Sequence, residues 1–182
     1  MNDQPPSSRR LFLALWPDDP ARLLLRAWRD AWTWPRGATP VHADKLHLTL
    51  HFLGSVAGER LPELLDGFSV PFTPFELRFG RPELWHGGIA VLAPHEAPQG
   101  LLELQAGLAS TLPGLGLQPE ARAYQPHVTM ARRAGGAALP QEGPAIAWRI
   151  DRYALVESRP DGSYTPLRIY RAGVQGDHDA RD

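Results

Sequence analysis

Lys45-Leu-His-Leu-Thr-Leu-His-Phe-Leu-Gly54 is the stretch of this sequence that decides most about its fold. From His47 onward it alternates polar and apolar residues, as a half-buried β-strand does. Side chains two positions apart on a strand share a face, so His47 and Thr49 should point to one side. Leu48 and Leu50 would then enter a hydrophobic core.

A second copy of the pattern lies in Pro126-His-Val-Thr-Met-Ala-Arg132, where His127 and Thr129 should again share a face. Random placement of 7 His and as many Thr in 182 residues gives about 0.3 His-x-Thr triplets, so two copies in apolar runs are a specific signal. Side by side, the two strands would bring two imidazoles and two hydroxyls together. Histidine titrates near neutral pH, so such a pair can act as acid and base on one substrate.

The composition excludes several classes of protein. The apolar content of 43% and the charged content of 21% are ordinary for a globular domain, and 182 residues can bury one core. A net charge of −1 provides no molecule-wide basic field of the kind that non-specific nucleic-acid binders carry, so any phosphate recognition must be local. The absence of Cys excludes disulfides, thiolate metal sites and cysteine nucleophiles.

The two ends of the chain are polar. Residues 1–8 predict a disordered lead and residues 173–182 a flexible tail, which leaves one two-lobed domain over 9–172. The start lacks the apolar centre of a signal peptide, and no apolar run approaches membrane-spanning length. We therefore expect a cytoplasmic protein with no membrane contact and no obligate protein partner.

Strands and helices are expected to alternate along the rest of the chain. Helices are expected from Pro20 to just before Trp34, over 61–68 with Pro62 in the first turn, and over 98–112. Strands are expected over 10–16, in the two His-x-Thr segments (the first closed by Gly54), over 73–79, in a hairpin around Gly87-Gly88, and over 146–157 paired with 164–170. This order indicates an α+β fold with antiparallel sheet. A strand-helix unit precedes each His-x-Thr segment, which suggests two related lobes.

On these residues the chain resembles the 2H phosphoesterases, specifically the bacterial and archaeal RNA 2′,3′-cyclic phosphodiesterases, also called 2′-5′ RNA ligases. The paired His-x-Thr motifs carry the resemblance, together with the opening strand Arg10-Leu-Phe-Leu-Ala14 and a final hairpin from Glu157-Ser-Arg159 to Gly162-Ser-Tyr164. The family often has Lys, Arg or Gln where this chain has His51. The resemblance implies a bilobal α+β fold, with two antiparallel sheet lobes and flanking helices around a central cleft, and neither metal nor cofactor.

The resemblance also implies an activity. The protein would hydrolyse 2′,3′-cyclic phosphate ends of RNA or nucleotides to 2′-phosphates, and the reverse reaction would join ends by a 2′-5′ bond. His47 is then assigned as the proton donor to the leaving 3′ oxygen and His127 as the proton acceptor from water. The residues alone do not separate these two roles. Thr49 and Thr129 can donate hydrogen bonds to the non-bridging phosphate oxygens.

Four further residues are candidates for substrate binding. Arg132 stands where the family has a basic residue after its second motif, so it is expected to contact phosphate. Strict alternation would instead place Arg133 on the face of His127, and Arg132 would need a bulge or a strand end to reach it. Phe12 is either a base-stacking platform or a core residue, with the core favoured. Tyr164 either touches a nucleobase or packs the final hairpin.

The remaining histidines and two tryptophans are expected to have other roles. By alternation His51 shares the face of His47, and a peripheral role is favoured for it. Trp28 and Trp32, four residues apart, are expected in the core. Four histidines in turn or tail sequence are expected on the surface: His42, His86, His95 and His178.

Two rival functions remain open at this point. A metal-dependent phosphoesterase could use two histidines with scattered Asp, although neither motif has an Asp-rich neighbourhood. A binding module could recognise a 2′-phosphate or cyclic-phosphate end of RNA without turning it over. Activity in a strong chelator would test the first, and alanine variants of His47 and His127 would test the second.

Overall fold

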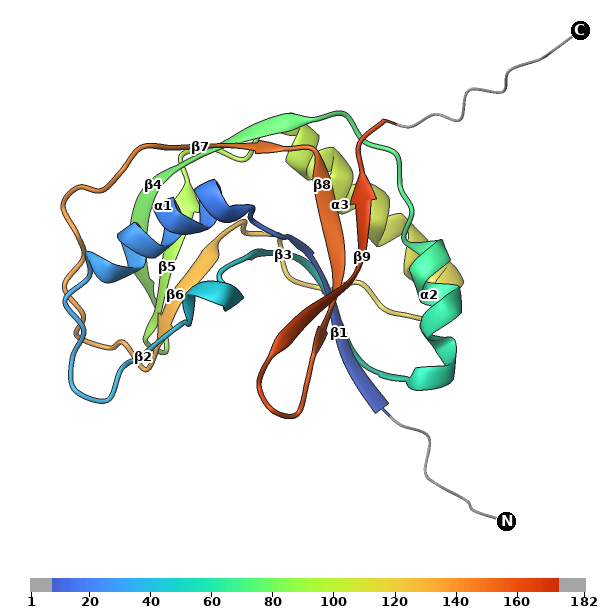
Figure 1. Cartoon of the computed structure of the whole chain (residues 1–182), viewed down its shortest axis with the longest axis horizontal. Coiled ribbons are helices and arrows are strands. Elements are labelled where there is room, and N and C mark those ends of the chain that lie inside the picture. The colour runs from blue at the N-terminus through green and yellow to red at the C-terminus, as the bar shows by residue number, and fades with distance from the viewer. Residues whose placement is uncertain (1–7, 174–182) are drawn as a thin grey trace, which may run out of the picture.

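A single curled antiparallel sheet forms the frame of the molecule (Figure 1). It is seen in a computed structural model in which residues 8–173 are described. Within these residues the sheet has nine strands in the order β7-β4-β5-β6-β3-β1-β8-β9, and β2 pairs with β6. The α+β class with antiparallel pairing is confirmed. The two expected lobes are the two halves of this sheet, which join where Leu48 of β3 pairs with Val128 of β6.

The elements follow one another closely along the chain. The strands are β1 (Ser8–Leu15), β2 (Thr39–Pro40), β3 (Leu48–Ala57), β4 (Phe75–Trp85), β5 (Ile89–Pro94), β6 (Val128–Arg132), β7 (Ile146–Ile150), β8 (Arg152–Ser158) and β9 (Tyr164–Arg171). The helices are α1 (Asp19–Asp30), α2 (Leu61–Gly67) and α3 (Gln99–Thr111), with 3-10 turns at η1 (Ala43–Lys45), η2 (Gly58–Arg60) and η3 (Pro113–Leu115). Ser8, expected in a disordered lead, belongs to β1. The expectations for 1–7 and 174–182, His178 included, lie outside the described residues.

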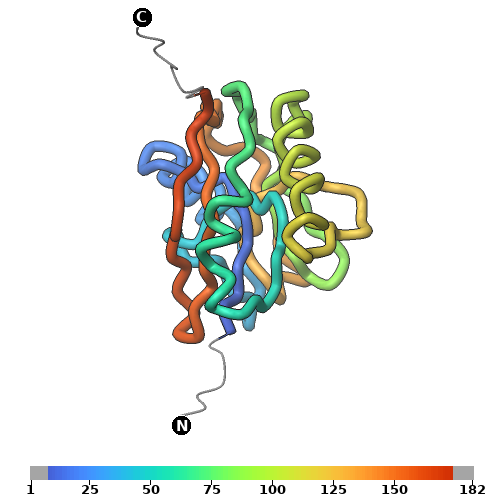
Figure 2. Tube along the Cα trace, turned by 90° about the vertical axis from the view of Figure 1, so that its right-hand side faces the viewer, coloured from blue at the N-terminus to red at the C-terminus, as the bar shows by residue number. Residues whose placement is uncertain are grey.

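The three helices begin where the sequence signals place them. Asp18 caps α1, because its carboxylate accepts a hydrogen bond from the amide of Ala21 at 3.0 Å. Pro62 lies in the first turn of α2, where its missing amide hydrogen costs nothing. Helix α1 packs on the half of the sheet that contains β7, and α3 packs on β3 (Figures 1 and 2). The helices therefore cover the two halves and leave the face with the His-x-Thr side chains open.

The expected strand over 146–157 is wrong as a single element. It ends at Ile150, and Asp151 separates β7, which pairs with β4, from β8, which lies between β1 and β9. The chain thus crosses from one half of the sheet to the other at Asp151. The apolar pattern changes there, since burial alternates along β7 but is continuous over residues 153–156 of β8. The expected hairpin is confirmed only for β8 and β9.

Two other strand boundaries differ from expectation because glycines bend strands instead of ending them. Gly54 has φ +74° beside a register shift, and β3 continues past it to Ala57. A register shift next to Gly80 lets β4 run through to Trp85, so the expected 73–79 strand and the first arm of the Gly87-Gly88 hairpin are one strand.

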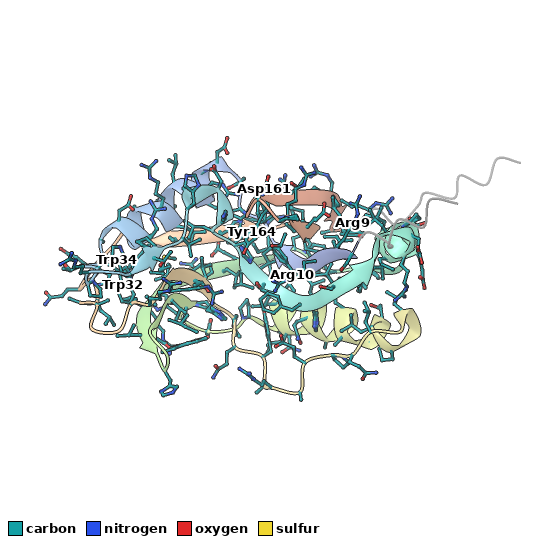
Figure 3. The ribbon with its side chains drawn as sticks, turned by 90° about the horizontal axis from the view of Figure 1, so that it is seen from below. Arg9, Arg10, Trp32, Trp34, Asp161 and Tyr164 are labelled. Carbon is teal, nitrogen blue, oxygen red and sulfur yellow. The ribbon has the colours of Figure 1, made fainter. Side chains whose placement is uncertain are left out.

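The main hydrophobic core contains residues from both halves of the sheet and from all three helices. Leu48, Leu50, Val128 and Met130 are all at most 3% exposed, as the alternation of both motifs predicts. Trp28 and Trp32 are each 4% exposed, as expected for core residues. Trp32 stacks on Trp34 with ring centroids 5.1 Å apart, at the end of the molecule away from Tyr164 (Figure 3).

Candidate active site

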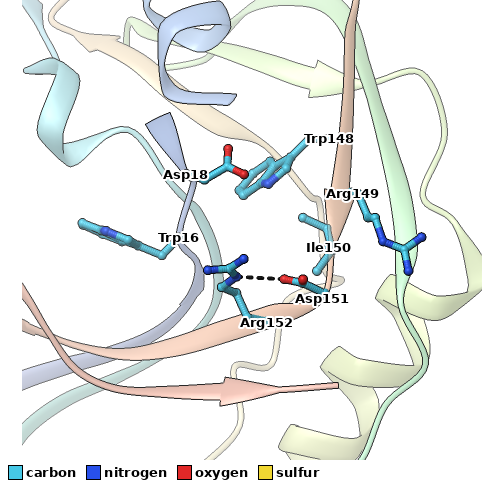
Figure 4. A pocket seen from close by; sticks show the side chains of 7 residues that line it. All are labelled: Trp16, Asp18, Trp148, Arg149, Ile150, Asp151 and Arg152. Atoms are coloured by element: carbon cyan, nitrogen blue, oxygen red, sulfur yellow. Dashed lines mark hydrogen bonds and ion pairs between the residues drawn. The ribbon is translucent and has the colours of Figure 1, made fainter. Parts of the chain in front are cut away.

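An open groove of about 740 Å³ runs along the uncovered face of the sheet and is lined by both motifs: His47, Thr49, His127 and Thr129. A second hollow of about 120 Å³ lies where β7 passes into β8 (Figure 4). It holds the Asp151–Arg152 ion pair, with 2.8 Å between the carboxylate and Nε, and none of the motif residues. The larger groove is therefore the candidate active site.

The two motifs are related by the strand pairing at the centre of the sheet. Leu48 pairs with Val128 in antiparallel orientation. Counting one residue outward in each direction sets His47 opposite Thr129 and Thr49 opposite His127. The histidines thus lie diagonally across the pair, and each faces the other motif's threonine.

A β-bulge at the fourth position of each motif changes which side chains reach the groove. On β3, His51 pairs with Leu13 and Thr49 with Ala14, so Leu50 is an extra residue. On β6, Ala131 pairs with Ala90 and Thr129 with Val91, so Met130 is an extra residue. An extra residue reverses the alternation beyond it. The fifth residue after each histidine, Phe52 or Arg132, consequently lines the groove.

The two bulges decide where three residues lie whose positions were predicted from strand alternation. Arg132 lines the groove, because the bulge at Met130 turns its side chain to the face of His127. Arg133 has φ +53°, lies past the end of β6 and does not line the groove. The expectation that His51 shares the face of His47 is wrong. His51 borders the groove, but it is only 4% exposed and its Nε2 hydrogen-bonds the Gln105 carbonyl of α3 at 2.8 Å.

His47 sits in an aromatic surround. The ring centroids of Phe12, Tyr164 and Trp16 lie 4.9, 5.6 and 5.8 Å from that of His47. Phe12 is 4% exposed, so it packs the histidine and offers no free face for stacking, in agreement with the favoured core interpretation. Tyr164 lines the groove, and the ammonium of Lys45 lies over its ring, with Nζ 5.5 Å from the ring centroid. Tyr164 thus both packs the hairpin and borders the groove.

His127 has a more polar surround. Its ring packs on Trp85 with centroids 4.5 Å apart. The indole N–H of Trp85 donates to Glu83 at 2.7 Å, and the other oxygen of that carboxylate pairs with Arg81 at 2.7 Å. The sequence expectations missed Trp85 and Phe52 as lining residues. An aromatic residue beside the Gly87-Gly88 turn was the available signal for Trp85, whereas nothing in the sequence signals the bulge that exposes Phe52.

Both histidines are held in the same tautomer by the backbone. Nδ1 of His47 lies 2.6 Å from the Lys45 carbonyl, and Nδ1 of His127 lies 2.7 Å from the Gln125 carbonyl. A carbonyl oxygen can only accept, so each Nδ1 carries the proton that it donates. Nε2 of each ring is left for chemistry. In His47 this atom is 3.0 Å from the Thr49 hydroxyl, which donates to it while the imidazole is neutral.

Burial lowers the pKa of both imidazoles. The pKa of His47 falls to about 4, chiefly by desolvation and then by the charges of His127, Arg22 and Arg132, against an opposing contribution from the Lys45 carbonyl. The pKa of His127 is also lowered by desolvation and by Arg132, while the Gln125 carbonyl and Glu83 oppose the shift. Both rings are therefore neutral at pH 7 in this structure.

Residues 8–173 contain neither a metal-ligand cluster nor a membrane-spanning helix. No group of three His, Asp or Glu side chains in this part of the chain is arranged to hold a metal ion. No helix in it is long and apolar enough to cross a membrane.

Comparison with known proteins agrees with this geometry. Residues 16–162 match the 2′-5′ RNA ligase superfamily. The chain belongs to this superfamily. The chain is similar to an RNA 2′,3′-cyclic phosphodiesterase of Escherichia coli (strain K12), to which it is 32% identical over 168 residues, covering 88% of this chain and 94% of that protein. A protein of the same name from Thermus thermophilus is 33% identical and covers 79% of each chain.

Solved structures of similar proteins share the fold. The crystal structure of E. coli LigT complexed with 3′-AMP has a TM-score of 0.81 at 29% identity, covering 91% of this chain and 99% of that one. The crystal structure of TT0787 from Thermus thermophilus has a TM-score of 0.70 at 27% identity, covering 93% of this chain and 100% of that one. The expected family and fold are both confirmed.

Proposed function

We propose that this protein is an RNA 2′,3′-cyclic phosphodiesterase, a phosphoric diester hydrolase that opens terminal cyclic phosphates to 2′-phosphates. One observation carries the proposal. Two imidazoles from paired, facing motifs share one groove, and each is held by a backbone carbonyl so that Nε2 is left for chemistry. Membership of the 2′-5′ RNA ligase superfamily and two relatives named as RNA 2′,3′-cyclic phosphodiesterases support it.

The reaction needs one group that accepts a proton and one that donates a proton. Water attacks phosphorus while the bond from phosphorus to the 3′ oxygen breaks, and the 2′ oxygen keeps the phosphate. One Nε2 takes the proton of the attacking water and the other gives a proton to the departing 3′ oxygen. Each role contributes about 10² to 10⁴ in rate.

We assign His47 as the acid and His127 as the base, following the family pattern. Of the two, His47 has the larger downward shift of its pKa in this structure. The assignment therefore requires that the bound phosphate raise the pKa of His47 above that of His127. An anionic phosphate beside a buried imidazole acts in this direction, because an opposite charge favours the protonated form.

The remaining groove residues supply binding. The hydroxyls of Thr49 and Thr129 donate to the non-bridging oxygens, where negative charge grows as water attacks. The Arg132 guanidinium binds the same phosphate with planar, paired donors. Tyr164, whose ring centroid lies 5.6 Å from that of His47, contacts the base or ribose of the terminal nucleotide.

The test is hydrolysis of a 2′,3′-cyclic mononucleotide in a strong chelator, with the phosphate position of the product read by ³¹P NMR. We expect a 2′-phosphate, and we expect His47→Ala and His127→Ala each to reduce kcat by about 10² to 10⁴. His95→Ala is the matched control, because His95 is exposed and does not line the groove. Normal hydrolysis by both motif variants would remove the proposal.

The same experiment separates the rival functions. Loss of turnover in chelator, restored by a divalent cation, would indicate a metal-dependent phosphoesterase. Binding of the cyclic nucleotide without turnover by the wild type would indicate a binding module. Incubating a 2′,3′-cyclic-phosphate end with a 5′-hydroxyl end would reveal any 2′-5′ ligation, in which the 5′ oxygen replaces water as the group that attacks phosphorus and the 3′ oxygen leaves. We also propose a cytoplasmic location, because RNA is available there, and cell fractionation would test it.

A further inference from the structure

Phe52 is an aromatic side chain that is not packed in the hydrophobic core. It is 56% exposed, although it lies in the middle of β3, and it lines the groove. Its ring centroid is 6.3 Å from that of Phe12, which in turn is 4.9 Å from that of His47. Phe12 therefore lies between Phe52 and His47, and the exposed face of the Phe52 ring is open to a ligand.

The two bulges give Phe52 a counterpart in the second motif. Phe52 follows His47 by five residues, and Arg132 follows His127 by five residues. Each is carried to the groove by the extra residue at the fourth motif position, Leu50 or Met130. The second half of the sheet thus offers a guanidinium where the first half offers an aromatic face. A guanidinium recognises phosphate, whereas an aromatic face recognises a base by stacking.

Arg10 lines the same groove from β1, the strand whose Phe12 pairs with Phe52 of β3. It is two residues before Phe12 on β1, so it shares the face of Phe12 and is displaced along the strand by about 6.6 Å, at about 3.3 Å per residue. Arg10 is exposed and lines the groove (Figure 3). It makes no ion pair within residues 8–173, whereas its neighbour Arg9 pairs with Glu157 at 3.4 Å. An unpaired guanidinium in a groove is available for a phosphate.

We propose that Phe52 and Arg10 form a subsite for the nucleotide that precedes the cyclic-phosphate terminus. The inference rests on the proposed function of the same groove. With the cyclic phosphate between His47 and His127, the base of the preceding nucleotide stacks on Phe52. The phosphate that joins it to the terminal nucleotide contacts Arg10. The substrate is then an oligonucleotide end in preference to a free cyclic mononucleotide.

The groove is large enough for this assignment. Its volume of about 740 Å³ lies in the upper part of the range of about 300 to 1,000 Å³ typical of ligand sites. Its lining also includes Arg122, an exposed residue that adds positive charge. The lining carries Arg10, Arg122 and Arg132 against one acidic residue, Glu120, so the groove is locally basic although the chain has a net charge of −1.

The test compares kcat/KM for a 2′,3′-cyclic mononucleotide with kcat/KM for the dinucleotide that ends in the same cyclic phosphate. For the wild type we expect the dinucleotide to be favoured by about tenfold or more, because stacking of one base and one phosphate contact both contribute. Phe52→Ala and Arg10→Ala should each reduce this ratio by about tenfold. Phe52→Tyr should keep the ratio, and Phe52→Leu should lose it. Raising the salt concentration should lower the wild-type ratio and change that of Arg10→Ala less.

Arg9→Ala is the matched control, because Arg9 is the adjacent arginine of β1, is paired with Glu157, and does not line the groove. It should keep the wild-type ratio. Equal kcat/KM for the two substrates in the wild type, or unchanged ratios in Phe52→Ala and Arg10→Ala, would overturn the subsite while leaving the phosphodiesterase intact. If the wild type hydrolyses neither substrate, the proposed function is what fails. The subsite is then decided by calorimetric binding of a dinucleotide 2′-phosphate, which both variants must weaken relative to Arg9→Ala for the proposal to stand.

Discussion

The two halves of the sheet present the same motif in different surroundings. His47 and His127 share the His-x-Thr spacing, the Nδ1–H bond to a carbonyl two residues earlier, and a bulge at the fourth position. Around His47 lie three aromatic rings, whereas His127 rests on one, Trp85, with Glu83 close enough to oppose the downward shift of its pKa.

This difference in surroundings accompanies a difference between the pKa values of the two imidazoles. Two identical motifs would give two identical imidazoles, and neither would be a better acid than the other. Desolvation by burial lowers the pKa of both imidazoles, and that of His47 falls to about 4. The motif therefore positions the histidines, and the neighbouring strands make them different.

The largest effect we expect comes from a substrate that distinguishes the role of the acid from that of the base. Sulfur in place of the leaving 3′ oxygen makes a leaving group that needs no protonation, since a thiolate is far less basic than an alkoxide. If His47 is the acid, His47→Ala should recover most of its loss of about 10² to 10⁴ on this substrate, whereas His127→Ala should not. Single-turnover kinetics on the oxygen and sulfur substrates measure this. Recovery by His127→Ala instead would reverse the two roles.

The threonines sharpen the same comparison. Thr49→Val and Thr129→Val each remove one hydroxyl donor to the phosphate, which costs about 10² to 10³ in kcat. We expect the larger loss for Thr49→Val, because the Thr49 hydroxyl also contacts Nε2 of His47 at 3.0 Å. Serine at each position should restore most of the rate. Equal losses would mean that the contact with His47 has no kinetic role.

The pH dependence of stability should also differ between the halves. His47 has a pKa of about 4 in the folded protein and about 6.5 when unfolded, so the unfolded chain binds more protons between these values. The contribution of neutral His47 is fully present above pH 6.5 and is lost as pH falls toward 4, by about 3 kcal/mol. Urea unfolding at pH 7 and at about pH 4.5 should show a smaller drop for His47→Gln than for the wild type. His127→Gln should reduce the drop less, and the reverse order would contradict the comparison.

The smallest effect should come from substitutions of Glu83 and Trp85, the residues beside His127. Glu83→Gln removes a negative charge that raises the pKa of His127, so the acidic limb of the kcat profile, which reports the base in the substrate complex, should move to lower pH. Trp85→Phe keeps the ring packing but breaks the 2.7 Å bond to Glu83, and should lower kcat only a few-fold. Trp85→Ala should cost more than Trp85→Phe. An unmoved acidic limb in Glu83→Gln would show that this carboxylate does not act on His127.

Alternation predicted much of the site, but it failed at specific residues. It correctly placed His47, Thr49, His127 and Thr129 in one groove, because no irregularity interrupts either triplet. It misplaced His51, because the bulge at Leu50 turns this residue toward α3. A bulge depends on the partner strand, and the partner is not visible in a local pattern.

The prediction of a single strand over 146–157 was wrong for a related reason. Local propensity favours a strand on both sides of Asp151, and only the packing of β7 on β4 and of β8 between β1 and β9 separates them. The sequence by itself determined the α+β class, the three helices and the paired motifs, since these follow from periodicity, caps and spacing within short windows. The tertiary structure alone decided the bulges, the aromatic surround of His47 and the exposure of Phe52. These depend on contacts between segments far apart in the chain, which no short window contains.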